Sequence, residues 1–206
     1  MSHEKELAVA LDAVRAAASL CEDVRREMVK EDTFSKKDRS PVTVADYGAQ
    51  ALICRALGQA FPGDPVVGEE DAAALRKPEN AEALERVTAY VAKHVAGAGA
   101  SEVTDWIDHG NGRVSPRYWT LDPIDGTKGF LRGDQYAVAL ALIEDGDLKA
   151  AVLGCPYLPV DADAAGGARG VLFSATRGGG AFAQAQENGG ASPIRVSDLS
   201  DPALAR

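Results

Sequence analysis

The second half of the sequence alternates apolar runs with turn residues, and this pattern constrains the fold more than any other feature. The apolar runs are residues 135–143, 148–159, 171–176 and 181–185. The acidic-glycine segment EDGD (144–147) separates the first two runs, and a glycine triplet (178–180) separates the last two. Short apolar runs that flank tight turns are typical of β-hairpins. The pattern therefore predicts antiparallel strands in this half.

The first half of the chain has helical periodicity instead. Apolar side chains recur every three or four residues through 4–29, which predicts one amphipathic helix. Thr43 and Asp46 form a T-x-x-D capping box, which predicts that a second helix opens there and runs through Leu57. Residues 79–96 are expected to form a third helix, followed by a loop at 97–101.

Two short strands complete the expected fold. Val66-Val67 follows a turn at 61–65, and a strand at 118–121 is expected to stop at Asp122-Pro123 because proline cannot donate a hydrogen bond to a sheet. Residues 161–170 are expected to form a loop, and a polar tail begins at about residue 187. Because helices come first and mostly antiparallel strands follow, the order predicts an α+β fold and disfavours a doubly wound parallel sheet.

Composition narrows the classes of function. The net charge of −9 argues against nucleic acid or an anionic membrane as a partner, and no apolar stretch approaches the ~20 residues of a membrane span. The start of the chain has neither signal-peptide nor transit-peptide composition, so a cytoplasmic location is expected by default. Three widely spaced cysteines in apolar surroundings are expected to be buried thiols. An anionic substrate would need a local positive charge, which a metal ion can supply.

Acidic residues stand where the expected elements end. In the turn DPIDGT, Asp122 and Asp125 can converge on one point with the carbonyl of Ile124 between them. Oxygen ligands of this kind suit Mg²⁺, which binds one or two carboxylates plus water and substrate phosphate. The hydroxyl of Thr127 follows closely and can orient a water molecule. The spacing indicates a magnesium site.

Each acidic segment also has a simpler interpretation. A D-P-x-D-G sequence is usually an Asx turn, and a Glu-Glu-Asp run such as 69–71 usually lies on a solvated surface. Asp46 alone is well explained as a helix cap near the positive end of the helix dipole. From spacing alone, the metal site and these simpler interpretations are about equally supported.

Three segments of the chain resemble the signature segments of a known enzyme superfamily. SPVTVAD (40–46), VVGEED (66–71) and WTLDPIDGTKGF (119–130) are similar to those of the lithium-sensitive, Mg²⁺-dependent phosphatases. That superfamily contains inositol monophosphatases, inositol polyphosphate 1-phosphatases and 3′(2′),5′-bisphosphate nucleotidases. KGFLR (128–132) resembles the bisphosphate nucleotidase branch of plants and fungi, whereas inositol monophosphatases usually follow DGT with a Thr-Asn-Phe type sequence.

The resemblance implies a fold and a set of metal ligands. The fold would be the layered α/β sandwich of the inositol monophosphatase type, here its N-terminal portion with a mostly antiparallel sheet. Glu69, Asp122, the carbonyl of Ile124 and Asp125 match the family's metal ligands. Glu70 would support the site without binding the metal directly.

The resemblance also implies catalytic and substrate-binding residues. Asp46 and Thr127 match the pair that holds and activates the attacking water. Gly126, Thr127 and Arg132 are expected to bind the substrate. The implied reaction is Mg²⁺-assisted hydrolysis, without a covalent intermediate, of the 3′-phosphate of adenosine 3′,5′-bisphosphate, or of its phosphosulfate form. AMP and phosphate would be the products, and lithium would inhibit this reaction of sulfur metabolism.

Two alternatives remain open at this point. One is an inositol phosphate phosphatase, which the TKGFLR segment (127–132) disfavours. The other is a catalytically silent fragment that binds metal in part or acts through protein association. The second alternative arises because family members are longer and carry a further metal-binding aspartate in a segment like WDxAAG, which 150–206 lacks. Residues 1–206 are therefore expected to be an N-terminal phosphatase domain without its C-terminal subdomain. The oligomeric state is left open.

Overall fold

The computed structural model describes residues 3–30, 40–161, 167–187, 189–201 and 203. Seven strands form one sheet in which the strand order follows the chain order. The strands are β1 (Val66–Val67), β2 (Arg117–Asp125), β3 (Ala137–Glu144), β4 (Asp147–Pro159), β5 (Arg169–Thr176), β6 (Gly180–Ala185) and β7 (Ser192–Ile194). Among these described strands the pair β1–β2 is parallel and every other pair is antiparallel. The predicted α+β class with a mostly antiparallel sheet is confirmed.

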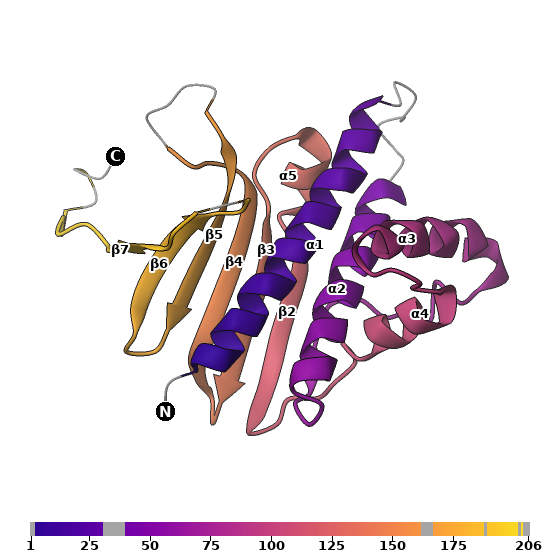
Figure 1. Cartoon of the computed structure of the whole chain (residues 1–206), viewed down its shortest axis with the longest axis horizontal. Helices are drawn as coiled ribbons and strands as arrows, with labels where there is room; N and C mark the ends of the chain where they lie inside the picture. Colours follow the sequence, from indigo (N-terminus) through magenta and orange to yellow (C-terminus); the bar gives the residue numbers. More distant parts are fainter. Residues whose placement is uncertain (1–2, 31–39, 162–166, 188, 202, 204–206) are drawn as a thin grey trace.

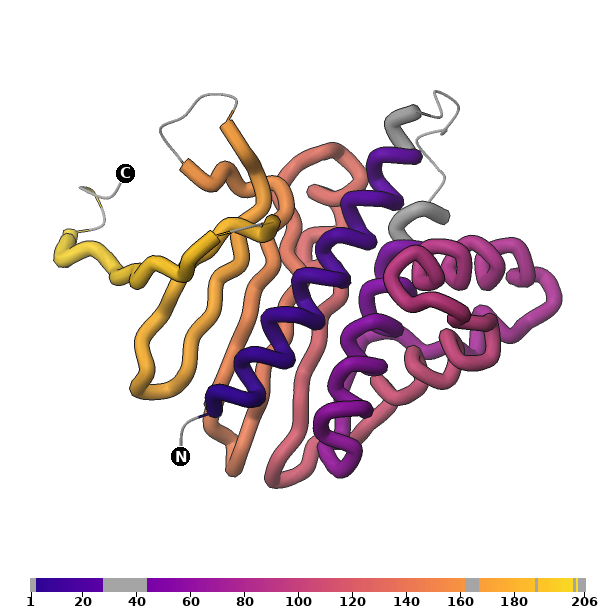
Figure 2. The backbone as a smooth tube through the Cα atoms, viewed as in Figure 1, coloured from indigo at the N-terminus to yellow at the C-terminus, as the bar shows by residue number. Residues whose placement is uncertain are grey.

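Two long helices cover one face of this sheet (Figure 1). Helix α1 (Glu4–Lys30) crosses β3, β4 and β5, and helix α2 (Ser40–Ala60) lies over β2. Helices α3 (Ala81–His94) and α4 (Ala100–Asp108) pack on α2, outside the area of the sheet, as the backbone tube in Figure 2 shows. The short helix α5 (Thr127–Arg132) follows β2 directly. A single turn of 3₁₀ helix (Pro78–Asn80) precedes α3.

The main core lies between these helices and the sheet. Trp119, Leu140 and Val152 are fully or almost fully buried on the helix-covered face, and each comes from a different strand. Alternate residues of a strand point to opposite faces. Thr120 and Asp122 of β2 therefore lie on the face that α1 and α2 do not cover. On the same uncovered face, small and large apolar side chains of β4–β7 line a shallow hollow of about 110 Å³.

The β3–β4 hairpin follows its sequence signal closely. β3 ends at Glu144 and β4 begins at Asp147, so Asp145 and Gly146 form the two-residue turn. Both turn residues have positive φ, 51° and 81°, which is the conformation of the type I′ turn that a right-twisted hairpin favours. The prediction of a hairpin turn at 144–147 is confirmed.

Several element boundaries differ from the expectations. Helix α2 begins at Ser40, so Asp46 lies inside the helix and the T-x-x-D segment does not form its opening capping box. Strand β2 continues past the expected stop to Asp125, but its pairing register shifts between Asp122 and Asp125, where Pro123 lacks an N–H. The proline interrupts the ladder without ending the strand.

Two elements occupy segments that were expected to be irregular. Helix α4 starts inside the expected loop at 97–101, with Gly99 as its N-cap, and buries Val103 and Ile107 on one side. Strand β7 lies in the polar tail and pairs with β6. Residues 162–166 of the expected 161–170 loop are outside the described residues, and β5 already begins at Arg169.

The prediction of buried thiols is confirmed for Cys21 and Cys54 but not for Cys155. Cys21 and Cys54 are buried and Cys155 is half-buried, and all three are free thiols. Burial raises the pKa of all three thiols: that of Cys21 lies well above its ordinary value, and that of Cys54 rises to about 12. Among the described helices, none has the length and apolarity that a bilayer crossing requires.

Candidate active site

Three segments that are distant in sequence meet at one edge of the sheet. Strand β1 runs parallel to β2, so Glu69 and Glu70, which follow β1, emerge in the same direction as Asp122 and Asp125 at the end of β2. Asp46 lies in the first half of α2. The charges of Glu70, Glu69 and Asp122 all act on Asp46, which places these four carboxylates close together.

The cluster of these four acids has an unusual electrostatic state. Asp46 is only 9% exposed, and its pKa is raised to about 8, first by burial and then by the charges of Glu70, Glu69 and Asp122. Burial, followed by the charge of Glu69, also raises the pKa values of Glu70 and Asp122. Within the described parts of the chain, no ion pair joins these acids to a lysine, arginine or histidine. The cluster is therefore a region of uncompensated negative charge.

The turn DPIDGT combines both interpretations that its sequence allowed. The backbone N–H of Ile124 donates to Oδ1 of Asp122 at 3.1 Å, which is the hydrogen bond of an Asx turn. The Thr127 hydroxyl, at the first residue of α5, donates to the carbonyl of Ile124 at 3.4 Å. Asp125 is exposed, and its charge acts on Asp122. The local turn and the acidic cluster therefore coexist in one segment.

Glycine is required where the turn enters α5. Gly126 has φ 93° and ψ 42°, the left-handed conformation, and a Cβ added there would lie 3.4 Å from Cα of Tyr136. An L-residue in this conformation is strained by about 1–2 kcal/mol. Gly126 thus lets the chain turn sharply from Asp125 into the helix that begins at Thr127.

The far end of α5 is attached to helix α1. Arg25 is 7% exposed, and its Nη1 donates to the carbonyl of Phe130 at 2.8 Å. Its guanidinium carbon also lies 4.4 Å from the ring centroid of Tyr157. Arg132, which was predicted to bind substrate, is the exposed last residue of α5. The predicted substrate-binding residues thus lie on a segment that Arg25 holds against the core.

The structure brings together some of the predicted site residues. Asp46, Glu69 and Asp122 interact electrostatically, whereas no hydrogen bond between the predicted pair Asp46 and Thr127 occurs among the described residues. Glu70 was expected to support the site, and its charge acts strongly on Asp46. The assignments of metal-binding, catalytic and substrate-binding roles stay predictions.

Sequence reasoning missed one side chain at this site. Gln50 is fully buried on α2, and its amide is hydrogen bonded to both the carbonyl and the N–H of Glu70. A signal for it was present in the sequence, because Gln50 is a polar residue among apolar ones and stands one helical turn after Asp46.

The chemistry of the acidic cluster fits a hard divalent cation. Carboxylate and carbonyl oxygens are ligands that Mg²⁺ prefers, and a cation would compensate the charges that raise the pKa of Asp46. Within the described ranges, no group of three or more His, Cys, Asp or Glu side chains is arranged to hold a metal ion. Mg²⁺ commonly keeps several waters and binds few protein carboxylates, so an open arrangement is compatible with it.

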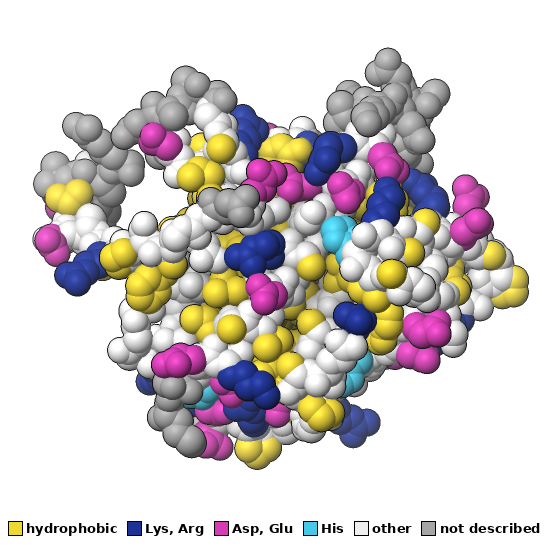
Figure 3. Space-filling model, viewed as in Figure 1, with side chains coloured by type: hydrophobic (Ala, Val, Ile, Leu, Met, Phe, Trp, Pro, Cys, Tyr) yellow, Lys and Arg dark blue, Asp and Glu magenta, His cyan; other side chains and the backbone are white. Residues whose placement is uncertain are grey.

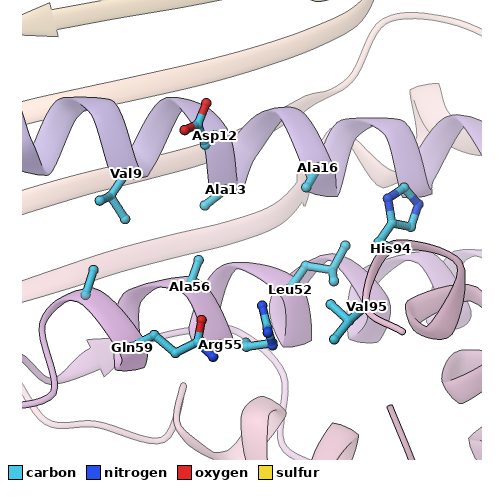
Figure 4. Close-up of a pocket in the computed structure, with 11 residues that line it drawn as sticks. Val9, Asp12, Ala13, Ala16, Leu52, Arg55, Ala56, Gln59, His94 and Val95 are labelled. Atoms are coloured by element: carbon cyan, nitrogen blue, oxygen red, sulfur yellow. The ribbon is translucent and has the colours of Figure 1, made fainter. Parts of the chain in front are cut away.

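A cavity of about 400 Å³ lies elsewhere, in the cleft between α1 and α2 near the end of α3 (Figure 4). Ala13 and Ala16 of α1 face Leu52 and Ala56 of α2 across it. Figure 3 shows hydrophobic side chains between charged ones on this helical face. None of the clustered acids lines the cavity, so it is separate from the candidate active site.

Comparison with protein families and curated proteins gives a consistent result. The family described as "Inositol monophosphatase family" matches residues 2–204. The chain is 44% identical to "3'(2'),5'-bisphosphate nucleotidase 1" of Arabidopsis thaliana over 98% of this chain and 63% of that protein. It is 42% identical to "3'(2'),5'-bisphosphate nucleotidase" of Schizosaccharomyces pombe over 95% of this chain and 60% of that protein. The chain thus spans about 60% of the length of these relatives.

Solved structures resemble the fold at lower identity. Mycobacterium tuberculosis SuhB matches with a TM-score of 0.57 and 24% identity, over 97% of this chain and 55% of that one. CysQ from Bacteroides thetaiotaomicron, "a bacterial member of the inositol monophosphatase family", matches with a TM-score of 0.53 and 20% identity, over 96% of this chain and 60% of that one. At these identities the likeness concerns the fold alone.

Proposed function

This chain belongs to the inositol monophosphatase family, and on that premise we propose that it hydrolyses the 3′-phosphate of adenosine 3′,5′-bisphosphate with Mg²⁺. The products would be AMP and inorganic phosphate, and the phosphosulfate form of the substrate would react in the same way. The relatives at 42–44% identity, which are named as bisphosphate nucleotidases, support this choice of substrate. The observation that carries the proposal is the buried Asp46 among three acids that have no cationic partner in the described parts of the chain.

The proposed ligand set comes from both strand ends. Glu69, Asp122, Asp125 and the carbonyl of Ile124 would hold the cation. When bound, Mg²⁺ would supply Lewis-acid activation of the phosphate and would lower the pKa of a water. The Asx turn fixes Asp122 relative to Ile124, since the N–H of Ile124 donates to its carboxylate. The turn thereby presents two of the proposed ligand groups from one rigid segment.

Asp46 would handle the proton of the attacking water. A general base works best when its pKa is near the working pH, and burial together with neighbouring acids raises the pKa of Asp46 to about 8. A cation bound beside it would lower that pKa again, because positive charge favours the carboxylate. The Thr127 hydroxyl would orient the same water, as it lies at the start of α5 beside the turn.

The substrate would lie over the turn into α5. Gly126 presents its backbone without a side chain, and the exposed Arg132 adds positive charge at the other end of the helix. The segment TKGFLR favours a nucleotide bisphosphate over an inositol phosphate, because it resembles the bisphosphate nucleotidase branch of the family. The net charge of −9 makes local positive charge necessary for any phosphate ligand.

A phosphate-release assay tests this proposal directly. The purified chain is incubated with adenosine 3′,5′-bisphosphate or with inositol 1-phosphate, each with Mg²⁺ or with a chelator. We expect Mg²⁺-dependent release from the nucleotide and inhibition by lithium. Release from inositol 1-phosphate alone would favour an inositol phosphatase. No release from either substrate would leave the chain as a silent member of the family.

A pair of variants connects the activity to the site. Asp125→Asn removes a proposed ligand that is exposed, so the fold should be retained. Asp134→Asn removes another exposed carboxylate just beyond α5 and serves as the control. We expect Asp125→Asn to lose at least 90% of the activity and Asp134→Asn to keep it. Equal activity in the two variants would contradict the metal assignment.

A further inference from the structure

We propose that Gln50 is a positioning residue that holds the Glu69–Glu70 segment at a fixed offset from Asp46. The inference rests on the proposed function, because the purpose of that offset would be to gather acids around a cation. Gln50 itself touches neither substrate nor metal in this proposal. Its effect would act through the backbone of Glu70.

The side-chain amide of Gln50 pairs with Glu70 as a neighbouring strand would. Its Nε2 donates to the carbonyl of Glu70 at 2.6 Å, and its Oε1 accepts from the backbone N–H of Glu70 at 3.0 Å. The second hydrogen of Nε2 is used as well, since Nε2 donates to the carbonyl of Ile107 at 2.9 Å. Gln50 is 0% exposed. Its amide therefore connects the segment after β1 to the end of α4.

Two glycines make room for this amide. A Cβ at Gly68 would lie 2.5 Å from Oε1 of Gln50, and a Cβ at Gly110 would collide with Nε2. Neither glycine has the positive φ that would itself require glycine. The N–H of Gly68 also donates to the carbonyl of Gly110 at 2.7 Å. The two glycines, joined by this hydrogen bond, form a narrow slot around the Gln50 amide. At Gly68 the Gln50 amide accounts for the lack of room for a side chain, whereas at Gly110 the carbonyl oxygen of Ile107, 3.0 Å from an added Cβ, limits the space as well.

Only an amide satisfies all three partners. A glutamate would face two carbonyl oxygens with no hydrogen to donate, a lysine could not accept from the N–H of Glu70, and an apolar side chain would leave buried backbone groups unpaired. Each unpaired buried group is destabilising by about 1–3 kcal/mol. The chemistry of the slot therefore selects glutamine specifically.

Helix α2 carries both Gln50, which is hydrogen bonded to Glu70, and Asp46, so the contact sets the distance between Asp46 and the Glu69–Glu70 segment. Asp46 and Gln50 are four residues apart on α2, so they project from the same face. Gln50 grips the backbone of Glu70, and the charges of Glu69 and Glu70 act on Asp46 one turn earlier. Without the amide, like-charge repulsion would favour movement of the Glu69–Glu70 segment away from Asp46 and Asp122.

The first test replaces Gln50 by methionine, which keeps the length of the side chain and removes its hydrogen bonds. Gln59→Met, at an exposed position of the same helix, is the matched control. Mg²⁺ is titrated calorimetrically into each metal-free protein without substrate. Outer-shell partners of metal ligands typically contribute 10- to 100-fold in affinity. We expect at least tenfold weaker Mg²⁺ binding in Gln50→Met and less than twofold change in Gln59→Met.

Steady-state kinetics add a readout that a purely structural defect would not produce. In Gln50→Met we expect the Mg²⁺ concentration for half-maximal rate to rise at least tenfold, whereas kcat at saturating Mg²⁺ falls less than threefold. An unchanged Mg²⁺ requirement in a folded Gln50→Met protein would overturn the proposal. A fall in kcat alone would overturn it as well.

A second pair of variants covers the case in which Gln50→Met does not fold. Gly68→Ala keeps Gln50 but pushes against its amide, and Gly63→Ala, with no atom within 4 Å of the added Cβ, is the control. Gly68→Ala should weaken Mg²⁺ binding at least fivefold, and Gly63→Ala should leave it unchanged. Equal affinity in both would overturn the proposal.

Hydrogen exchange separates failure of this inference from failure of the proposed function. If the wild-type chain neither binds Mg²⁺ nor releases phosphate, the proposed function fails. The positioning role is then decided by the backbone amide of Glu70, which donates to Gln50. Its exchange should be at least tenfold faster in Gln50→Met, or in Gly68→Ala if Gln50→Met does not fold. Unchanged exchange would overturn the positioning role by itself.

Discussion

The negative charge of Asp122, at the end of β2, raises the pKa of Asp46 on α2. The two residues belong to separate layers of the fold, one in the sheet and one in the helices that cover it. Glu69 and Glu70 add to the same effect on Asp46. The metal-free protein therefore stores electrostatic repulsion at this site, and the repulsion depends on pH.

We predict that the metal-free protein becomes less stable as the pH rises from about 4 to 8. Asp46 has a pKa of about 8 when folded, so in this range the folded chain binds a proton that the unfolded chain has lost. Asp46 alone then lowers the free energy of unfolding by at most about 1.4 kcal/mol per pH unit. Urea denaturation in the presence of a chelator measures this slope. Asp46→Asn should flatten it, whereas Glu85→Gln, at an exposed position on α3, should not.

Asp122→Asn should change stability and metal binding in opposite directions. Asparagine keeps an oxygen that accepts from the N–H of Ile124, but it removes the charge that acts on Asp46. Because Asp122 is half-exposed, we expect the metal-free variant to gain only about 0.2–0.5 kcal/mol at pH 8. Its Mg²⁺ affinity should fall at least tenfold, about 1.4 kcal/mol. Denaturation and calorimetry on the same preparation give both values, and a variant that loses stability without metal would contradict the repulsion.

Gly126→Ala should destabilise the turn into α5. Alanine at φ 93° is strained, and its Cβ would press on the backbone of Tyr136, so we expect a loss of about 1–2 kcal/mol in the free energy of unfolding. Gly63→Ala has open space around its Cβ, and its stability should change by less than about 0.5 kcal/mol. Chemical denaturation of both variants checks this. Equal losses of stability in the two variants would contradict the requirement for glycine in the turn into α5.

Arg25→Met should loosen α5 more than the neighbouring Arg26→Met. Arg25 is buried, donates to Phe130 and stacks on Tyr157, so its removal should reduce stability by about 2–3 kcal/mol. Arg26 has a largely exposed side chain that pairs with Asp23 within the same helix, and such pairs contribute less than about 1 kcal/mol. Similar losses of stability in the two variants, measured by urea denaturation, would contradict the attachment of α5 through Arg25.

Local sequence signals predicted the parts of the fold that local forces determine. The β3–β4 hairpin follows from Asp145-Gly146 between apolar runs, because turn conformation and strand alternation are encoded within a few residues. Helix α1 likewise matches the predicted range of 4–29 almost residue for residue. In contrast, the predicted start of α2 at Thr43 was wrong, because the helix already begins at Ser40. A T-x-x-D pattern can also occur inside a helix whose first turn precedes it.

Long-range contacts explain the parts that could not be predicted. The three residues of strand β7 are exposed, and the strand is held by its pairing with β6, so its own sequence gives little indication of a strand. The acids at strand ends could be recognised as a group, but not the contact of Gln50 with Glu70. That contact depends on how α2 packs against the segment after β1, which no local pattern specifies.

The order of the strands has a consequence for how the molecule assembles. Each strand from β3 to β7 pairs with the strand before it in the chain, so these antiparallel pairs close over short stretches of sequence. Strand β1 is different, because Val66 pairs with Trp119 only after the whole segment with α3 and α4 has been looped out. Loop closure of this length is entropically unfavourable and is made late in folding. We therefore expect the meander to form first and the acidic cluster, which β1 completes, to be among the last native features that a refolding chain acquires.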